Sequence, residues 1–439
     1  MKIMLNQRPQ GGLHGTLQVP GDKSLSHRGL ILGAISTGTT TLRRFLPAAD
    51  CLATLTALQA LGVPIKRQGT TVTVTGVGLR GLRPASAALD LKNAGTATRL
   101  LTGLLAGQAF DSRLIGDASL SRRPMARVQA PLAKFGARVQ TTSGHLPLTI
   151  HGRQLHAAQV RMTVASAQVK SALILAALQA PTASTIVEKQ PTRDHTERLL
   201  RQFGGRITTA PDQRTIVVDP GAQLHGCDVT IPGDPSSAAF WLAAATIVPK
   251  SRLRLTNVGL NPTRLGFLRI LKRMGGRVTV TPHTSATTTA EPVGDLLVSS
   301  AELTPVQLTA ADIPAVIDEL PLVALLAATA NGVSTIRGAA ELRFKETDRI
   351  ATIVTELRKL GVAVTPLADG LIIDGRQTWQ RPTTAFDSHG DHRIGMMMAV
   401  AALRLPAPVA LVGAQAWEIS YPAFLTDLQT VCRERVNAW

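Results

Sequence analysis

Apolar residues along the chain recur with the spacing of a helix in some runs and alternate as in a strand in others. The change from the first pattern to the second is repeated several times. Amphipathic runs with helical spacing stop at a glycine, and a short run with alternating β-prone residues follows each stop. Glycine at that place suits a left-handed helix cap, because it has no Cβ to strain the backbone. The stops lie about 70 to 85 residues apart, at Gly62, Gly136, Gly204, Gly275 and Gly361. A helix near Tyr421–Val431 would be a sixth copy, so the chain repeats a whole supersecondary unit.

Each copy also contains an earlier helix whose start is rich in small and polar residues. Most of these starts follow a short alternating strand, such as 89–91, 160–164 or 228–231. The six starts are at residues 21–24, 93–96, 165–168, 233–237, 317–320 and 390–393. A unit therefore reads strand, helix, strand, helix and two strands, and six units predict an α/β protein with two domains of three units each.

The domain boundaries are predicted from a repeated turn. Pro20-Gly21 recurs as Pro232-Gly233, and we interpret the two turns as paired hinges. One domain is then discontinuous, with residues 1–20 and 233–439, and residues 21–232 form an inserted domain. Two lobes joined by two strands suggest closure over a ligand.

Composition limits the classes of function. Apolar residues make up 44% of the 439 and aromatic residues 3%, which suits helices packed on sheets and disfavours a protein that stacks nucleic-acid bases. The net charge of +18 implies anionic partners, and the dispersed Lys and Arg residues favour small anions over nucleic acid. No apolar run is long enough to cross a bilayer, and three cysteines form no metal-binding pattern. We expect a cytoplasmic monomer with no metal, no cofactor, no membrane contact and no nucleic-acid partner.

The stretch from residue 19 to residue 28 is the clearest candidate for anion binding. It closes a predicted strand at Thr16–Val19 and opens a helix, and its first turn carries Lys23, Ser24 and Arg28. An anion there would meet free backbone N–H groups, the helix dipole and two cations. The alternative is a capped turn with solvated charges.

Eight motifs in order make the chain resemble the 5-enolpyruvylshikimate-3-phosphate synthase family over essentially its whole length. The motifs lie at residues 21–28, 93–99, 123–125, 166–170, 193–197, 261–264, 345–349 and 391–393. The resemblance implies a two-domain inside-out α/β barrel in which each domain has three βαβαββ units. It also implies transfer of the enolpyruvyl group of phosphoenolpyruvate to the 5-hydroxyl of shikimate 3-phosphate, through a tetrahedral ketal and with release of phosphate.

The resemblance also implies the site residues. Both substrates carry a carboxylate and a phosphate, which arginine grips in bidentate fashion. The residues implied for phosphoenolpyruvate are Lys23, Gly95, Arg123, Gln168, Arg349 and Arg393. Those implied for shikimate 3-phosphate are Lys23, Ser24, Arg28, Ser166, Gln168, Arg193, Asp318 and Lys345.

Two proton transfers need catalytic groups. Asp318 is the candidate base for the hydroxyl, with Glu319 as its nearest rival and a helix N-cap as the alternative role. Lys23 and Glu346 are the two candidates for the substrate methylene. Lys345, Glu346 and Arg349 are expected to open a helix, and a surface ion-pair set is the alternative interpretation of those three.

Other residues are minor candidates or are expected to be structural. His27 and His392 could assist the reaction or could simply be hydrogen-bonded, whereas Arg99 and Met396–Met398 are expected to be structural.

The sequence departs from the family pattern in places. Ile419 stands where a lysine is often found, which puts one phosphate contact in question. Several motifs resemble the glyphosate-tolerant branch, whereas Gly95 stands where tolerant members often carry alanine, so we predict intermediate sensitivity. UDP-N-acetylglucosamine enolpyruvyl transferase is a rival interpretation, but its loop cysteine is missing from the corresponding residues 118–127.

Overall fold

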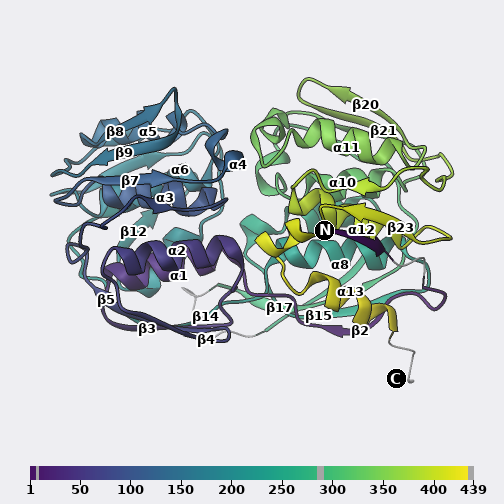
Figure 1. The fold of residues 1–439 in the computed structure, drawn as a ribbon, viewed down its shortest axis with the longest axis horizontal. Helices are drawn as coiled ribbons and strands as arrows, with labels where there is room; N and C mark the ends of the chain where they lie inside the picture. Colours follow the sequence, from purple (N-terminus) through teal and green to yellow (C-terminus); the bar gives the residue numbers. More distant parts are fainter. Residues whose placement is uncertain (6–8, 284–290, 434–439) are drawn as a thin grey trace. The chain divides into compact units, whose positions relative to one another are not determined.

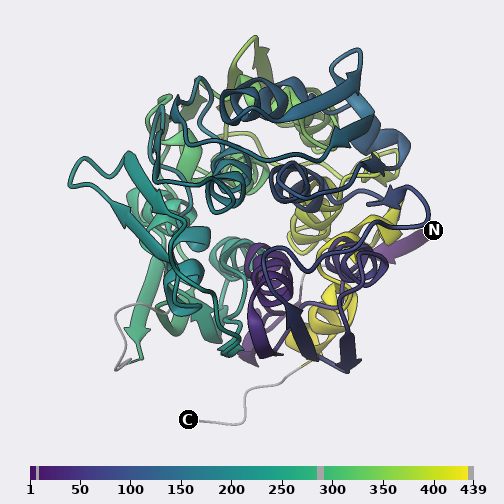
Figure 2. The ribbon, with the colours of Figure 1, turned by 90° about the vertical axis from the view of Figure 1, so that its left-hand side faces the viewer.

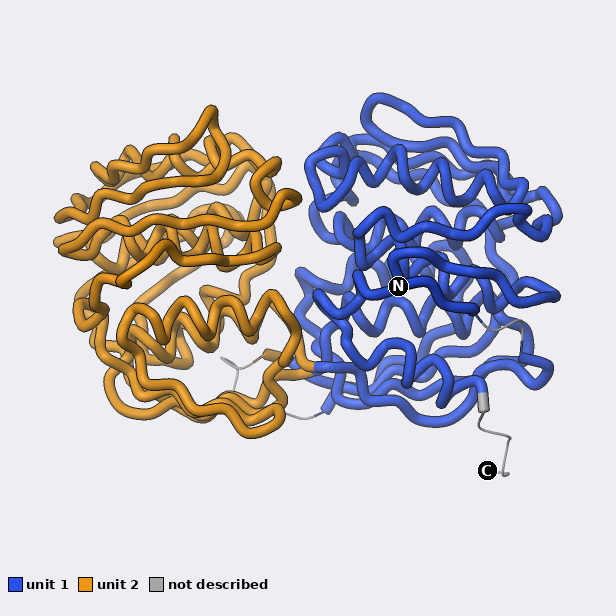
Figure 3. Tube along the Cα trace, in the orientation of Figure 1, with its two compact units in different colours: residues 1–20, 233–284, 292–439 blue, residues 21–232, 285–291 orange. Residues whose placement is uncertain are grey.

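The computed structural model describes residues 1–5, 9–283 and 291–433. The chain divides into two compact units (Figures 1 and 3). Unit 1 consists of residues 1–20, 233–284 and 292–439, and unit 2 of residues 21–232 and 285–291. The chain passes between the units at Pro20-Gly21 and at Pro232-Gly233, and Glu291 also falls with unit 2 although the sequence suggested the other domain.

Unit 2 contains three repeats in which strand, helix, strand, helix and two strands follow one another, and the first repeat takes its first strand from the end of the unit's sequence. Its elements are α1 (Lys23–Ile35), β3 (Thr37–Arg43), α2 (Ala49–Ala60), β4 (Ile65–Gln68), β5 (Thr71–Val77), β6 (Leu89–Asp90), α3 (Gly95–Leu105), β7 (Ser112–Ile115), α4 (Ala118–Ser121), α5 (Ala126–Leu132), η1 (Ala133–Phe135), β8 (Arg138–Thr142), β9 (His145–His151), β10 (Gln159–Arg161), α6 (Ala167–Ala177), β11 (Ser184–Val187), α7 (His195–Gln202), β12 (Arg206–Thr209), β13 (Thr215–Asp219) and β14 (Asp228–Thr230).

Unit 1 repeats the same order of elements. They are β1 (Lys2–Leu5), β2 (His14–Leu17), α8 (Pro235–Ile247), β15 (Arg252–Gly259), η2 (Pro262–Arg264), α9 (Gly266–Arg273), β16 (Arg277–Pro282), β17 (Val293–Ser299), β18 (Gln307–Leu308), η3 (Ile313–Ala315), α10 (Leu320–Ala327), β19 (Val333–Ile336), η4 (Ala340–Phe344), α11 (Arg349–Arg358), β20 (Ala363–Leu367), β21 (Gly370–Asp374), β22 (Phe386–Asp387), α12 (His392–Ala402), β23 (Val409–Val412), η5 (Ala414–Ile419) and α13 (Phe424–Arg433).

Within the described residues, six small sheets correspond to the six predicted repeats, three in each unit. The sheet β6-β7-β9-β8 shows the pattern: β6 and β7 are parallel, whereas β9 is antiparallel to both β7 and β8. Four other sheets share this order: β14-β3-β5-β4, β10-β11-β13-β12, β2-β15-β17-β16 and β18-β19-β21-β20. In the sixth, β22-β23-β1, the N-terminal strand pairs antiparallel with β23, with Ile3 opposite Leu411.

The chain crosses from unit 1 to unit 2 after β2, and it returns to unit 1 after β14. Each of these two strands pairs within the unit that it belongs to before the crossing. β2 leads to Pro20-Gly21 but pairs in parallel with β15, with Gly15 opposite Leu253. β14 leads to Pro232-Gly233 but pairs in parallel with β3, with Val229 opposite Leu42. In unit 2 the first sheet is therefore completed by a strand from the end of that unit's sequence, whereas in unit 1 the last sheet is completed by β1 from the beginning of its sequence.

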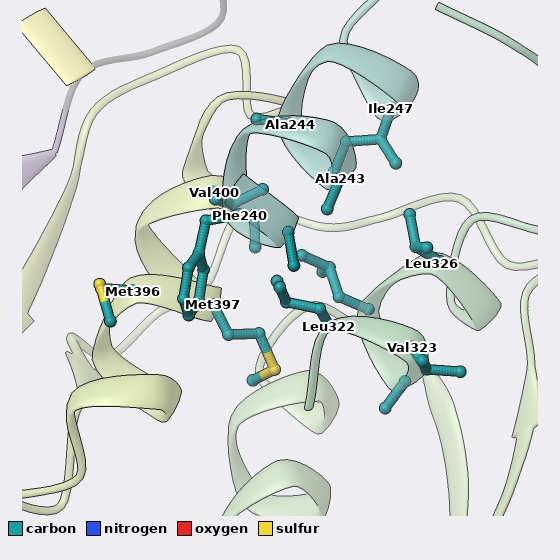
Figure 4. Close-up of a cluster of buried hydrophobic side chains, with 14 of the residues drawn as sticks. Phe240, Ala243, Ala244, Ile247, Leu322, Val323, Leu326, Met396, Met397 and Val400 are labelled. Atoms are coloured by element: carbon teal, nitrogen blue, oxygen red, sulfur yellow. The ribbon is translucent and has the colours of Figure 1, made fainter. Parts of the chain in front are cut away.

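Helices lie inside each unit and sheets lie outside. The helices are seen nearly end-on in Figure 2, with the strands around them. In unit 1, apolar side chains of α8, α10 and α12 meet around Phe240, Leu322 and Met397 (Figure 4). Met396–Met398 are at most 1% exposed, which confirms their predicted role in the core. Helices α8 and α10 are apolar on all sides because they are covered on all sides.

The five predicted glycine stops are confirmed. Gly62, Gly136, Gly204, Gly275 and Gly361 have φ angles of 85°, 79°, 86°, 92° and 79°. At the first of them, the Val63 N–H donates to the Leu58 carbonyl oxygen and the Gly62 N–H to that of Gln59, so the last carbonyls of α2 are satisfied.

Two helix starts differ from the prediction. Helix α11 begins at Arg349, because the Asp348 side chain accepts a hydrogen bond from the Ala351 N–H at 3.1 Å and ends the preceding turn. Lys345 and Glu346 therefore precede the helix instead of opening it. Helix α13 begins at Phe424, three residues later than expected. Among the described residues, no helix is long and apolar enough to cross a membrane.

Candidate active site

In unit 2, the start of α1 holds the first cluster of predicted site residues. The Asp22 side chain caps the helix by accepting from the Leu25 N–H at 2.9 Å. Lys23 follows directly, and its Nζ lies 2.9 Å from Asp50 Oδ2 with 19% of the side chain exposed. Lys23 is thus fixed by a buried carboxylate yet remains open to a ligand, as is the half-buried Ser24.

Arg28 joins the starts of three helices. Its Nε donates to Thr196 Oγ1 on α7 at 2.7 Å, and its Nη2 donates to Ser171 Oγ on α6 at 2.8 Å. Its Nη1 donates to the Ser24 carbonyl oxygen at 3.0 Å. The N-terminal halves of α1, α6 and α7 are therefore neighbours, although α1 lies more than 100 residues from the other two helices in sequence.

Gln168 joins the start of α6 to the start of α3. Its Oε1 accepts from Arg99 Nη1 at 2.6 Å, and its Nε2 donates to Thr96 Oγ1 at 3.0 Å. Arg99 therefore positions a predicted ligand residue, which is consistent with the structural role expected for it. Ser166 caps α6 by accepting from the Val169 N–H.

Gly95 opens α3 directly beside two guanidinium groups. A Cβ at this position would lie 3.0 Å from Arg123 Nη1 and 3.0 Å from Arg99 Nη1. Arg123 is held by Asn93, whose Oδ1 accepts from its Nη2 at 2.6 Å. Glycine here leaves room for both arginines, so that a small anion could approach the backbone N–H groups of α3.

Arg193 lies beside the start of α7. It is half-buried and lies two residues before α7, whose Thr196 bonds Arg28. The next residue but one, His195, contacts Glu291 at 2.7 Å between Nδ1 and Oε1.

In unit 1, Asp318 is the centre of the second cluster. Its Oδ1 lies 3.2 Å from Lys345 Nζ and 3.9 Å from Arg349 Nη1, and its Oδ2 lies 4.0 Å from Arg393 Nη2. The N-cap position of α10 is occupied by Glu319, with no side-chain cap bond. The alternative role of Asp318 as an N-cap is therefore wrong, and its carboxylate instead faces three cations.

Arg349 is fully buried between two carboxylates. Its Nε lies 2.7 Å from Asp391 Oδ2, and its Nη2 lies 3.2 Å from Asp391 Oδ1 and 2.7 Å from Glu346 Oε2. Burial raises the pKa of Asp391, but the Arg349 guanidinium outweighs it and holds that pKa below the usual range. Buried as it is, Arg349 is not part of a surface ion-pair set.

Arg393 belongs to a second chain of buried polar groups that joins α12 to α10 and α8. Its Nη1 lies 3.7 Å from Glu319 Oε1, which accepts a hydrogen bond from Ser236 Oγ on α8. Ser236 Oγ also accepts from Arg264 Nη2 at 2.8 Å. Sequence reasoning did not single out Ser236 or Arg264, although each lies in a segment that it quoted.

Burial lowers the pKa of two groups near these clusters. It lowers the pKa of Lys345, with Arg349 adding to the effect and Asp318 and Glu346 opposing it. It also lowers the pKa of His27 well below the usual value, helped by Lys23 and Arg28. His27 is therefore neutral and bonds Thr54 Oγ1 at 2.7 Å, which favours the interpretation that it is structural.

Two further predictions concern residues outside the clusters. Within the described ranges, no group of three His, Cys, Asp or Glu side chains could hold a metal ion. Ile419, at the position of the family lysine, is half-buried at the end of η5.

Each unit thus brings the N-terminal ends of several helices together around buried cations, an arrangement suited to binding polyvalent anions.

The fold is that of the enolpyruvyl transferases. The structure resembles EPSP synthase from Acinetobacter baumannii with a TM-score of 0.84, 40% identity and 98% coverage of both chains. It resembles the enolpyruvyl transferase NikO from Streptomyces tendae with a TM-score of 0.79 at 20% identity, which bears on the fold alone.

The sequence comparisons specify the family. The family EPSP synthase (3-phosphoshikimate 1-carboxyvinyltransferase) matches residues 7–428. A relative named 3-phosphoshikimate 1-carboxyvinyltransferase from Lactiplantibacillus plantarum is 69% identical over 424 residues, 97% of this chain and 98% of its own. One of the same name from Bacillus subtilis is 44% identical over 96% of this chain and 98% of its own. The chain belongs to the EPSP synthase family, so the predicted family, fold and enzyme class, a transferase, are confirmed.

Proposed function

We propose that the clusters of unit 1 and unit 2 each contribute residues to the reaction of this enzyme, which transfers the enolpyruvyl group of phosphoenolpyruvate to the 5-hydroxyl of shikimate 3-phosphate and releases phosphate. The observation that supports this most is the linkage of the family's motif residues at the helix starts of each unit. Gln168 and Arg28 make those links in unit 2, and Asp318 and Arg393 make them in unit 1.

The substrates fit the charge of the clusters. Each substrate carries a carboxylate and a phosphate of roughly −1.5 to −2 charge. Arg123 and Arg393 are 7% and 8% exposed. Because little water surrounds their guanidinium groups, they attract an anion more strongly than exposed arginines would. We assign Arg123, Arg349 and Arg393 to the phosphate and carboxylate of phosphoenolpyruvate.

Asp318 is the proposed base for the hydroxyl of shikimate 3-phosphate. Its side chain is 19% exposed and faces Lys345, which favours the charged carboxylate that a base requires. Its rival Glu319 is 4% exposed and is engaged with Ser236 and Arg393. The accessible carboxylate is therefore the better candidate.

Lys23 and Glu346 remain the two candidates for protonating the methylene and later removing a proton from the methyl group. Both are partly exposed, and each has a fixed partner, Asp50 for Lys23 and Arg349 for Glu346. Deuterium from solvent should enter the substrate methylene in the wild type. We expect Lys23→Met and Glu346→Gln to slow this exchange to different extents. The variant with the slower exchange identifies the residue that moves the proton.

The activity is tested by phosphate release from phosphoenolpyruvate with shikimate 3-phosphate as the only acceptor. We expect release at a rate typical of enzymes, on the order of 1 to 1000 per second at saturation, and none without acceptor. UDP-N-acetylglucosamine is the matched control, because the rival family uses it as acceptor. Release with that sugar and not with shikimate 3-phosphate would contradict the proposal.

A further inference from the structure

Lys170 is a buried cation of unit 2 that the proposed chemistry does not use. Its side chain is 1% exposed, and its Nζ lies 2.8 Å from Glu197 Oε1 and 3.1 Å from Glu188 Oε2. Both carboxylates are 2% exposed. Burial lowers the pKa of Lys170, but Glu197 and Glu188 outweigh it and hold that pKa above its usual value, so the amine is charged.

The lysine joins three segments that are separate in sequence. It lies on α6, Glu197 lies on α7, and Glu188 follows β11 directly. Its Nζ also donates to the Thr192 carbonyl oxygen at 3.4 Å, and the Thr192 hydroxyl donates to Glu188 Oε1. The turn from Glu188 to Thr192 is therefore closed on itself and attached to α6 through one amine.

Each attached segment carries a residue assigned to shikimate 3-phosphate. Arg193 is the residue after Thr192, and Ser166 caps α6 one turn before Lys170. Beside the Lys170–Glu197 pair, Ser171 Oγ and Thr196 Oγ1 lie 2.7 Å apart, and both accept from Arg28. A shift of α7 relative to α6 would thus displace Arg193 and Arg28 together.

We propose that Lys170 is a positioning residue, which holds Arg193 and Arg28 in place for shikimate 3-phosphate while touching neither substrate. The inference rests on the proposed function, because it takes these arginines as ligands of that substrate. Arg123 is held instead by Asn93, and Gln168 is held by Arg99 and Thr96. Loss of Lys170 should therefore affect one substrate more than the other.

A role in stability alone is separable from a role in positioning. Removing only the lysine would leave two buried carboxylates without a cation, which is strongly destabilising. Replacing the whole ionic set by uncharged groups of similar size is often neutral for stability. The informative variant is therefore Lys170→Met combined with Glu188→Gln and Glu197→Leu, which keeps the packing and removes the attachment to the Thr192 carbonyl.

The test is steady-state kinetics of this triple variant. We expect KM for shikimate 3-phosphate to rise roughly tenfold or more, with KM for phosphoenolpyruvate and kcat within about threefold of the wild type. The matched control is Gln179→Met, which disturbs the buried amide contacts of Gln179 with Gln108 just beyond the far end of α6. It should lower the unfolding temperature and leave both KM values unchanged.

Two results would overturn the inference. One is a folded triple variant with the wild-type KM for shikimate 3-phosphate. The other is an equal rise in that KM for Gln179→Met, which would show a general effect of destabilised helices. The wild-type enzyme measured alongside tests the proposed function separately, because failure of that function would remove turnover from the wild type as well.

Discussion

At the scale of single residues, the buried charges of unit 1 are held by aspartates that serve two purposes. Asp391 caps α12 by accepting from the Arg393 N–H, and the same carboxylate binds Arg349. Asp234 caps α8 in the same way and pairs with Arg264 Nη2 at 2.9 Å. Because a lone buried charge is costly, these double contacts let arginines lie at dehydrated helix starts.

The first prediction concerns Asp318. Asp318→Asn should keep the fold and lower kcat by about 100-fold to 10,000-fold, the usual range for a general base. Asp312→Asn is the matched control, because that partly exposed carboxylate is also ion-paired, with Arg273, in the same unit. Initial rates of phosphate release measure both, and near-normal turnover in Asp318→Asn would remove Asp318 from the mechanism.

The second prediction concerns Lys345, whose pKa is lowered mainly by burial. As the pH rises through that pKa, the amine loses its charge and attracts the anionic substrate less. The affinity for shikimate 3-phosphate should therefore fall at a lower pH than an ordinary lysine, with a pKa of about 10.4, would produce. Lys345→Arg keeps its charge at every pH used and should move this fall to higher pH.

The measurement is KM for shikimate 3-phosphate between about pH 7 and pH 10, around the usual lysine range. Lys359→Arg is the control, because Lys359 pairs with Glu356 away from Asp318 in the same unit. If KM rises at the same alkaline pH in the wild type and in Lys345→Arg, another group causes the rise, and the prediction is contradicted.

At the scale of elements, glycine has two different roles: some glycines end a helix, and others let two helices pack closely. Gly204 has a φ of 86° and open surroundings, since a Cβ would come no nearer than 3.6 Å to another residue. Gly103 instead lies where α3 meets α6, and a Cβ would lie 2.0 Å from the Ala172 carbonyl oxygen. The first glycine relieves backbone strain, and the second permits close packing.

The third prediction follows from this difference. Gly204→Ala should lower the free energy of unfolding by about 1 to 2 kcal/mol, the cost of a left-handed residue. Gly103→Ala should cost about 3 kcal/mol, at the upper end for overpacking, because backbone atoms must move. Gly11→Ala, which meets nothing within 4 Å, should leave stability unchanged or slightly raised. Urea denaturation ranks the three, and equal costs for Gly204 and Gly103 would contradict this account.

Most helices could be predicted from the sequence because their signals are local. The left-handed glycines, and caps such as Asp22 and Ser166, lie next to the helix that they define. The start of α11 was misplaced because Asp348 competes with the polar residues before it, and nothing in the sequence ranks them. The cluster of Lys170, Glu188 and Glu197 was missed because its members meet only after three segments pack together.

At the scale of the whole molecule, the repeat predicts six units but does not say which sheet each strand joins. The repeated turn places residues 1–20 with residues 233–439, but the alternating pattern of β2 does not identify β15 as its partner strand. Likewise, Glu291 was predicted with residues 233–439, yet it contacts His195 and falls with unit 2. The identities of the site residues came from matching motifs, because the spacing alone also suits capped turns with solvated charges.

The central claim is that Arg123 of unit 2 and Arg393 of unit 1 each bind phosphoenolpyruvate. The most direct test is KM for phosphoenolpyruvate, from phosphate release at saturating shikimate 3-phosphate, in Arg123→Met of unit 2 and Arg393→Met of unit 1. The exposed arginines Arg122 and Arg376 give the matched controls Arg122→Met and Arg376→Met. We predict a rise of at least about tenfold in each site variant, as expected for losing a charged contact, and no change in the controls. A wild-type KM in either site variant would contradict the account.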